Sequence, residues 1–138
     1  MSEETKYELV KFIDDELELE VSVSPKEETV WLSLEEMSSL FERDRSVIGK
    51  HIRKIYQDNE LDANRTRAKN ARHLNDGRIF QVDVYNLDVI IAVGYRVNSK
   101  KATEFRIWAT KILKEYMTKG FALNDERFIR GNKKILNG

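Results

Sequence analysis

The residues whose types and spacing suggest chemistry form a short polar stripe. One face of a helix would carry Ser46, Gly49, Lys50 and Arg53. Arginine and lysine bond guanine edges or phosphates, serine bonds either, and glycine allows close backbone approach. This stripe therefore has the composition of a face that reads the major groove of double-stranded DNA. A solvated amphipathic helix is the alternative interpretation, because helical hairpins are common. The opposite face is expected to be buried and comprises Val47, Ile48, His51, Ile52, Ile55 and Tyr56.

Two short helices joined by a tight turn would position this stripe. Ser33 and Glu36 have the spacing of a capping box, so the first helix should begin there. Asp44 is a second N-cap, for a helix from Arg45 to about Asp58. A helix-turn-helix usually carries glycine in its turn, whereas this chain has Glu42, which requires either a different turn or a left-handed residue. The apolar face of the first helix comprises Leu34, Met37, Leu40 and Phe41.

A basic hairpin is predicted directly after the helix pair. Residues 59–78 are polar and strongly basic, and Asn75, Asp76 and Gly77 give a strong hairpin-turn signal. In the outgoing strand, RIFQVDVY, alternate residues Phe80, Val82 and Val84 should point inward. A basic hairpin in this place is typical of a wing, which bonds phosphates or enters the minor groove. The alternative is a solvated loop.

The predicted DNA contacts fall into two groups. Residues 45–54 would lie in the major groove and touch bases or phosphates, while Arg43 and the hairpin would hold the backbone. The major-groove group comprises Arg45, Ser46, Lys50, Arg53 and Lys54, while Arg43 belongs with the backbone contacts. The hairpin group comprises Arg65, Arg67, Lys69, Arg72 and Arg78.

The charge distribution supports a polyanionic partner only when basic and acidic residues are counted segment by segment. The 138 residues hold 24 Lys or Arg against 24 Asp or Glu, and a net charge of zero by itself disfavours a nucleic-acid partner. Residues 1–42 hold 3 basic residues against 13 acidic ones, residues 43–78 hold 10 against 5, and residues 79–138 hold 11 against 6. A basic side would orient the chain on a polyanion. Such asymmetry is also common in proteins that bind no nucleic acid.

The flanking segments predict an α+β fold around the helix pair. Residues 7–13 and 17–23 read as a hairpin, in which Leu17, Leu19, Val21 and Val23 alternate with Glu18, Glu20 and Ser22. Its outward face is acidic, so it should not touch DNA. A tryptophan strand, TVWL, follows, with Trp31 as a core anchor. The expected architecture is an N-terminal β-hairpin, a helix-turn-helix, a basic wing and a long C-terminal helix.

Two helices should complete the domain. Asn86 caps a short, almost wholly buried helix, LDVIIAVG. Ser99 caps the longest helix, residues 100–119, which Gly120 ends. A winged-helix-like domain is therefore expected over residues 1–120, with a tail over 121–138. The packed face of the long helix would comprise Phe105, Ile107, Trp108, Ile112, Leu113 and Tyr116.

Composition excludes several functional classes. The chain has no cysteine, so it has no disulfide, thiolate metal site or cysteine nucleophile. Neither an HExxH motif nor a glycine-rich phosphate loop nor a GxSxG elbow occurs. We therefore expect no enzyme, cofactor, metal or small-molecule substrate, although a nuclease using scattered carboxylates remains the enzymatic alternative. The acidic start and the lack of a ~20-residue apolar run indicate a cytoplasmic protein with no membrane partner.

A protein-interaction module is the second functional class that the chain permits. Its acidic hairpin would dock a partner or a second copy of the chain, and the long helix would form a homodimer interface through Tyr116 or Phe121. Such a module would have no DNA target of its own. The salt dependence of binding distinguishes the two classes. Affinity that depends on phosphate contacts falls steeply as the salt concentration rises, whereas the affinity of an apolar interface hardly changes.

Several stretches also carry a family resemblance: TVWLSLEEMSSLF, HIRKIYQDNELD, YNLDVII and FRIWAT. Through them the chain resembles the virulence-associated RhuM family from about Lys6 to Arg127. The arrangement is also similar to the Bro-N and KilA-N DNA-binding domains of phages and large viruses. The resemblance implies DNA binding and a role in transcription regulation in bacteria or mobile elements. Family members generally continue into a helical C-terminal region, so the chain looks like an N-terminal domain.

Overall fold

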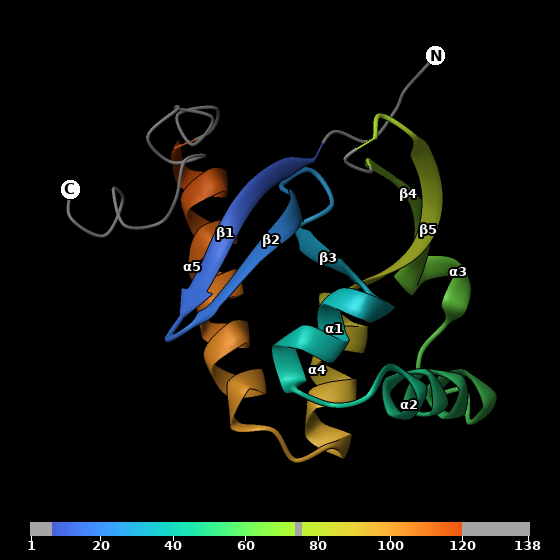
Figure 1. Ribbon diagram of the computed structural model, residues 1–138. Helices are drawn as coiled ribbons and strands as arrows, with labels where there is room; N and C mark the ends of the chain where they lie inside the picture. The colour runs from blue at the N-terminus through green and yellow to red at the C-terminus, as the bar shows by residue number, and fades with distance from the viewer. Residues whose placement is uncertain (1–6, 74–75, 120–138) are drawn as a thin grey trace. The chain divides into compact units, whose positions relative to one another are not determined.

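The computed structural model describes residues 7–73 and 76–119 of the chain (Figure 1). Within these residues it contains five strands and five helices, which confirms the predicted α+β class. Neighbouring strands run antiparallel in the hairpins β1–β2 and β4–β5 and in the pair β2–β3. In chain order the elements are β1 (Glu8–Asp14), β2 (Leu17–Ser24), β3 (Thr29–Ser33), α1 (Leu34–Phe41), α2 (Arg45–Gln57), α3 (Ala63–Thr66), β4 (Arg67–His73), β5 (Ile79–Asn86), α4 (Leu87–Arg96) and α5 (Lys100–Lys119).

The chain divides into two compact units. One comprises Met1–Trp31 with Thr103–Gly138, of which the structure describes residues 7–31 and 103–119. The other is Leu32–Ala102. The predicted helix stop at Gly120 and the predicted tail lie outside the described residues, so the domain boundary at residue 120 stays a prediction.

The first unit contains the expected N-terminal hairpin. The register from Glu8↔Val23 to Asp14↔Leu17 leaves Asp15 and Glu16 in the turn, where Asp15 has φ 52°. The alternation predicted for β2 holds for Leu19, Val21 and Val23, which are all buried. Ser22, expected to point outward, is buried, at a position where β2 pairs with Trp31 of β3. Trp31 is 5% exposed, which confirms it as a core residue.

The long helix α5 lies beside β1 in the first unit (Figure 1). The ring of Phe12 packs edge-on against Phe105, at 5.3 Å between centroids, and against Trp108, at 5.2 Å. Ala109, Ile112, Leu113 and Tyr116 are buried on the same helix. The prediction that Ile107 lies on the packed face is wrong, since Ile107 is 57% exposed. It follows Phe105 by two positions, about 200° around the helix, and therefore points away from the buried side.

The second unit is built on the predicted helix pair. The Glu36 backbone N–H donates to Ser33 Oγ at 3.1 Å, and the Ser33 N–H donates to Glu36 Oε1 at 2.8 Å, which confirms the capping box. Glu42 ends α1 in the left-handed region, at φ 56°, so the turn does use a non-glycine residue there. Asp44 caps α2, and Asn86 caps α4. These caps fix where each helix begins.

The predicted hairpin is present as β4 and β5. Its register runs from Arg67↔Tyr85 to His73↔Ile79. In the turn, Asn75 lies outside the described residues, while Gly77 has φ 91°, a conformation that favours glycine. Val84 is buried and Val82 is half-buried, as expected for the inward face. Phe80 is 43% exposed, so the prediction that it points into the core is wrong. It lies in the outer part of the hairpin, beyond the elements that cover the hairpin base.

Candidate nucleic-acid interface

The exposed face of α2 is polar and cationic. Ser46, Lys50 and Arg53 all lie on it, together with Lys54 and Gln57. The residues on the buried side are Ile48, Gly49, Ile52 and Ile55, with His51 and Tyr56 half-buried at its edges. The helix therefore presents one continuous hydrophilic stripe along its length.

The exposed and buried faces of α2 are rotated slightly from those predicted. Val47, expected in the buried stripe, is 37% exposed, whereas Gly49, expected on the exposed stripe, is buried. A Cβ at Gly49 would lie 3.3 Å from Leu34 Cδ1, so α1 packs over this position. The prediction that Gly49 lets α2 approach a groove closely is therefore wrong. The absence of a Cβ at Gly49 instead lets α1 and α2 approach each other.

The two central cations of this face, Lys50 and Arg53, have no anionic partner within residues 7–73 and 76–119. Among the residues that the structure describes, neither Lys50 nor Arg53 makes an ion pair or hydrogen bond through its side chain. Lys54 lies 3.6 Å from Asp58, one turn further on. Pairs as exposed as this one contribute little. Positive charge on the middle of α2 is thus available to a ligand.

The first turn of α2 is held by local polar contacts. Arg45 forms an exposed ion pair with Glu35 of α1, at 3.0 Å. The Ser46 hydroxyl donates to Asp44 Oδ2 at 2.5 Å, and the Ser46 backbone N–H donates to the same oxygen at 3.3 Å. Both hydrogen bonds lower the pKa of Asp44 below its ordinary value, and the bond from the Ser46 hydroxyl has the larger effect. Ser46 therefore serves the helix cap as well as the exposed face.

Arg43, in the turn between α1 and α2, makes hydrogen bonds that stabilise the fold. Its guanidinium donates to the carbonyl oxygen of Phe41 at 3.0 Å and to that of Val97 at 2.7 Å. Those carbonyls lie at the ends of α1 and α4, where backbone acceptors lack helical partners. Arg43 thus joins the two helix ends, although its side chain is partly exposed.

The hairpin, which we call the wing (residues 67–73 and 76–86), has two different faces. Along β4, Arg67, Lys69, Ala71 and His73 are exposed, while the residues between them are half-buried. Arg72 therefore points away from Arg67 and Lys69, to the opposite face. The predicted cations of the wing do not form one surface.

Most of the wing cations already have partners. Lys69 pairs with Asp83 at 2.8 Å, and Arg78 pairs with Asp76 at 2.7 Å. The Arg67 guanidinium lies 5.9 Å from the centroid of the Tyr56 ring, within cation–π range. Arg65, in α3, is exposed, and its guanidinium has no partner among the described residues.

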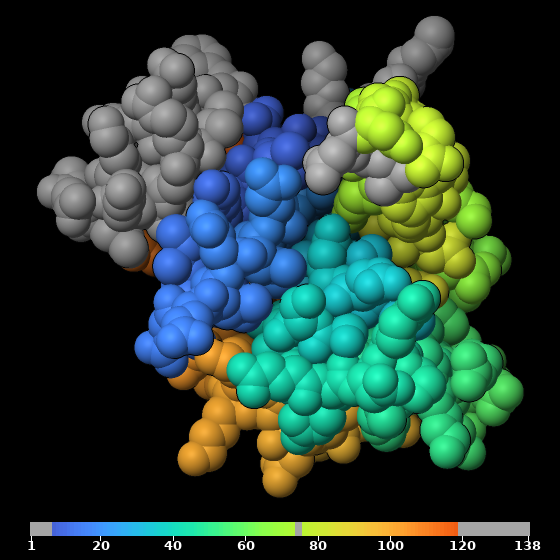
Figure 2. Space-filling view, viewed as in Figure 1, coloured from blue at the N-terminus to red at the C-terminus, as the bar shows by residue number. Residues whose placement is uncertain are grey.

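Contacts with α1 and α2 fix the wing relative to the helix pair. Arg72 makes two hydrogen bonds to Glu36, at 3.2 and 3.1 Å, and the two side chains are only 22% and 23% exposed. At the other end, the Tyr56 hydroxyl of α2 is 2.9 Å from Thr66 Oγ1 of α3. The Tyr56 ring lies 6.5 Å from that of Tyr85 in β5, and burial raises the pKa of both tyrosines. The wing and α2 are thus held as one surface, both visible in Figure 2.

A groove of about 510 Å³ lies where the wing meets the starts of α1 and α2. Two arginines, Arg45 and Arg72, line it, but each is paired with a carboxylate of α1. Its other lining residues are Ser33, Leu34, Glu35, Glu36, His73, Phe80, Val82, Asp83 and Tyr85. Cationic, acidic and apolar groups are mixed here, so the groove selects no single class of small ligand.

Within residues 7–73 and 76–119, no three His, Asp or Glu side chains are placed to hold a metal ion. None of the described helices is long and apolar enough to cross a membrane.

Comparison with known proteins identifies the family. The model of the virulence protein RhuM family matches residues 62–137, just over half of the chain. The chain belongs to the virulence protein RhuM family. In this RhuM chain the match takes in α3, the wing, α4 and α5, whereas α1 and α2 precede it. No curated protein and no solved structure matches the chain. The resemblance before residue 62 and the likeness to Bro-N and KilA-N domains stay predictions.

Sequence reasoning missed several residues of this RhuM surface. Val47 and Gln57 extend the exposed face of α2, and His73 and Ile79 lie on the exposed face of the wing. The burial of β4 alternates with period two, but its sequence, RAKNARH, has no matching alternation of apolar and polar residues, so apolar patterning does not detect the wing face. No sequence signal marked Glu36 as the partner of Arg72, because the two lie far apart in the chain.

Proposed function

We propose that this RhuM-family chain binds double-stranded DNA, with α2 in the major groove and the wing against the adjoining backbone and minor groove. The observation that carries the proposal is the exposed stripe of α2, whose central cations, Lys50 and Arg53, have no anionic partner among the described residues. Cations without protein partners are free to neutralise phosphates and to bond guanine edges. The resemblance to transcription-regulating DNA-binding domains supports the same proposal.

The attachment of the wing adds a second argument. A reading helix needs a scaffold that sets its depth and orientation, and contacts to the phosphate backbone provide this. Here Tyr56 joins α2 to α3 at the base of the wing, and Glu36 joins α1 to Arg72 of β4. A duplex that meets α2 would therefore meet the wing in a fixed geometry.

A charge-matched pair of double variants tests the proposal. Lys50→Ala with Arg53→Ala removes two cations from α2, and Lys111→Ala with Lys114→Ala removes two exposed cations from α5. On duplexes selected in vitro from random sequence, the α2 variant should bind at least about tenfold more weakly, since a good base contact is worth about 1–3 kcal/mol. The slope of log affinity against log salt should also fall by about two. The α5 variant should bind as the unmodified chain does. Equal affinity of the two variants would refute the assignment of α2.

We propose that binding involves no catalytic step. The sequence lacks the motifs of hydrolases and of phosphate-binding loops, and the described residues hold no cluster of metal ligands. Incubation with supercoiled plasmid and Mg²⁺ or Mn²⁺ should leave the plasmid intact. Nicking that co-purifies with the chain would identify a nuclease instead.

Self-association is a second candidate function, favoured by the first unit. Leu9 and Ile13 of β1 are 49% and 46% exposed and lie four residues apart, on one side of the strand. Ile107 and Met117 of α5 are 57% and 59% exposed. Of the two residues proposed for a dimer interface, Tyr116 is buried within this unit and Phe121 lies outside the described residues. Sedimentation equilibrium should detect a dimer that persists at high salt, and Leu9→Lys should dissociate it.

A further inference from the structure

The first turn of α2 carries one apolar side chain on its exposed face. Val47 is 37% exposed, and its backbone N–H donates to the carbonyl oxygen of Asp44, the N-cap residue, at 3.0 Å. Its neighbours on the same side of the helix, three and seven positions further on, are the exposed cations Lys50 and Lys54. Lys50 has no anionic partner among the described residues, whereas Lys54 lies 3.6 Å from Asp58. Val47 therefore belongs to the face assigned above to the major groove.

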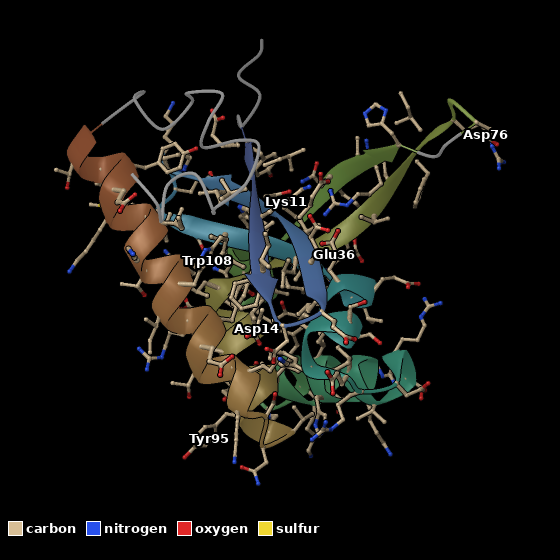
Figure 3. All side chains as sticks on the ribbon, turned by 60° about the vertical axis from the view of Figure 1, so that its left-hand side comes forward. Lys11, Asp14, Glu36, Asp76, Tyr95 and Trp108 are labelled. Atoms are coloured by element: carbon tan, nitrogen blue, oxygen red, sulfur yellow. The ribbon has the colours of Figure 1, made fainter. Side chains whose placement is uncertain are left out.

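Neither complete burial nor helix propensity accounts for a valine at this position. Val47 is only partly covered, and a β-branched side chain makes a helix less stable than alanine does. It is also separate from the exposed apolar residues of the wing, Ile79 and Phe80. These lie toward the outer end of the hairpin, where Figure 3 shows Asp76 far from Glu36 of α1, while α2 packs against α1. What valine provides on a helix is rigidity, because one χ1 rotamer predominates and fixes both methyl groups relative to the backbone.

We propose that Val47 determines sequence specificity by contacting the 5-methyl group of a thymine in the major groove. This inference rests on the proposed DNA-binding function and deepens it, because it names a base that the helix distinguishes. In the major groove, a T·A pair presents this methyl group, which apolar side chains recognise by contact. The N-terminal residues of a recognition helix are those that contact base edges, and Val47 is the third residue of α2. A small and rigid apolar group in the first turn suits such a contact.

The spacing of Val47 and Lys50 predicts the neighbouring base pair. Their separation is about 4.5 Å along the helix axis, against about 3.4 Å between successive base pairs, so the two side chains can address adjacent pairs. The Lys50 ammonium group has no anionic partner among the described residues, and lysine donates to O6 and N7 of guanine. The thymine that Val47 contacts should therefore lie next to a G·C pair.

The test removes the methyl group from the thymine and the methyl groups from the valine separately. Duplexes are selected in vitro with the unmodified chain, and each thymine of the selected site is replaced in turn by deoxyuridine, which lacks only the 5-methyl group. At one thymine per bound chain, beside a G·C pair, this replacement should weaken binding by about fourfold, as expected for one methyl-sized apolar contact. Val47→Ala should bind the thymine and deoxyuridine duplexes equally, because its shorter side chain does not reach the methyl group. Val47→Ile should keep the preference for thymine.

The matched control is Ile107→Ala, which removes an exposed β-branched side chain from α5. It should prefer thymine over deoxyuridine as strongly as the unmodified chain does. Each variant is judged by the ratio of its own affinities for the two duplexes, so partial unfolding of a variant does not change the result. Alanine favours a helix more than valine does, so Val47→Ala should keep α2 folded, which circular dichroism checks.

The two proposals fail in different ways. If the unmodified chain selects and binds no duplex, the proposed DNA-binding function is wrong, and the thymine contact is wrong with it. If the chain binds a selected duplex but no deoxyuridine replacement weakens binding, only the thymine contact is wrong. The assignment to Val47 is also overturned if Val47→Ala keeps the full preference for thymine, or if Ile107→Ala loses the preference to the same extent.

Discussion

Glu36 is the residue whose replacement tests most directly how the wing is held. Its carboxylate accepts from the Ser33 backbone N–H at 2.8 Å and binds Arg72 through two hydrogen bonds at 3.2 and 3.1 Å. Glu36→Gln keeps the capping bond, since glutamine also serves in a capping box, but removes the charge that holds Arg72. Glu36→Ala removes both interactions. The two variants therefore separate the helix cap from the ion pair.

The magnitudes follow from the burial of the two groups. Fully exposed ion pairs contribute about 0.2–1 kcal/mol, and this pair is about three-quarters buried and doubly bonded, so Glu36→Gln should cost about 1 kcal/mol. Loss of the capping bond adds about 1 kcal/mol, so Glu36→Ala should cost about 2 kcal/mol. In a double-mutant cycle with Arg72→Met, the coupling energy to Glu36→Gln should be about 1 kcal/mol.

Urea denaturation at neutral pH measures these differences as shifts of the transition midpoint at constant slope. Equal stability of Glu36→Gln and the unmodified chain would refute the ion pair as a support of the wing. Equal losses in Glu36→Gln and Glu36→Ala would refute the separate contribution of the cap. A coupling energy near zero with Arg72→Met would show that Glu36 acts without Arg72.

Two further predictions concern the scaffold of the second unit. Gly94→Ala should destabilise it by about 2 kcal/mol, because the new Cβ would lie 2.4 Å from Ala102 Cβ and 3.0 Å from the Phe41 ring, and adding Ala102→Gly should restore part of the loss in thermal unfolding. The lowered pKa of Asp44 stabilises the fold above its ordinary value of 3.8, and this contribution is lost as pH falls through the lower native value. Asp44→Asn should therefore make unfolding less pH-dependent between about pH 6 and about pH 3 than in the unmodified chain, and identical pH profiles would contradict the shift.

Local interactions made much of the fold predictable from the sequence. Capping needs only the few residues around a helix start, and Ser33, Asp44 and Asn86 all cap the helices predicted for them. The strand β2 was predictable because its alternation is unbroken over Leu17–Val23. The sequence left two possibilities for the turn at Glu42, and the structure has the left-handed one.

The orientation of side chains on those elements was not predictable to the same degree. Val47 and Gly49 flank Ile48, and only the packing of Leu34 over Gly49 decides which of them is buried. In the same way, Phe80 continues an inward alternation, but the elements covering the base of the wing do not reach it. Both positions depend on tertiary contacts, which hydrophobic patterning does not contain.

The pairing of charges decides which cations of this chain of zero net charge would contribute most to the proposed DNA binding. A cation that is already bonded to a carboxylate must exchange one anion for another, and it releases fewer counterions in doing so. Arg45, Lys69 and Arg78 are in this position, each bonded to a carboxylate within the second unit. Lys50 and Arg53 have no such partner among the described residues, so their whole charge is available to a phosphate or a base. A count of basic residues therefore overstates the unpaired positive charge of the wing more than that of α2. This is why the two cations of α2, rather than the larger number in the wing, are the ones whose loss should weaken binding most per charge removed.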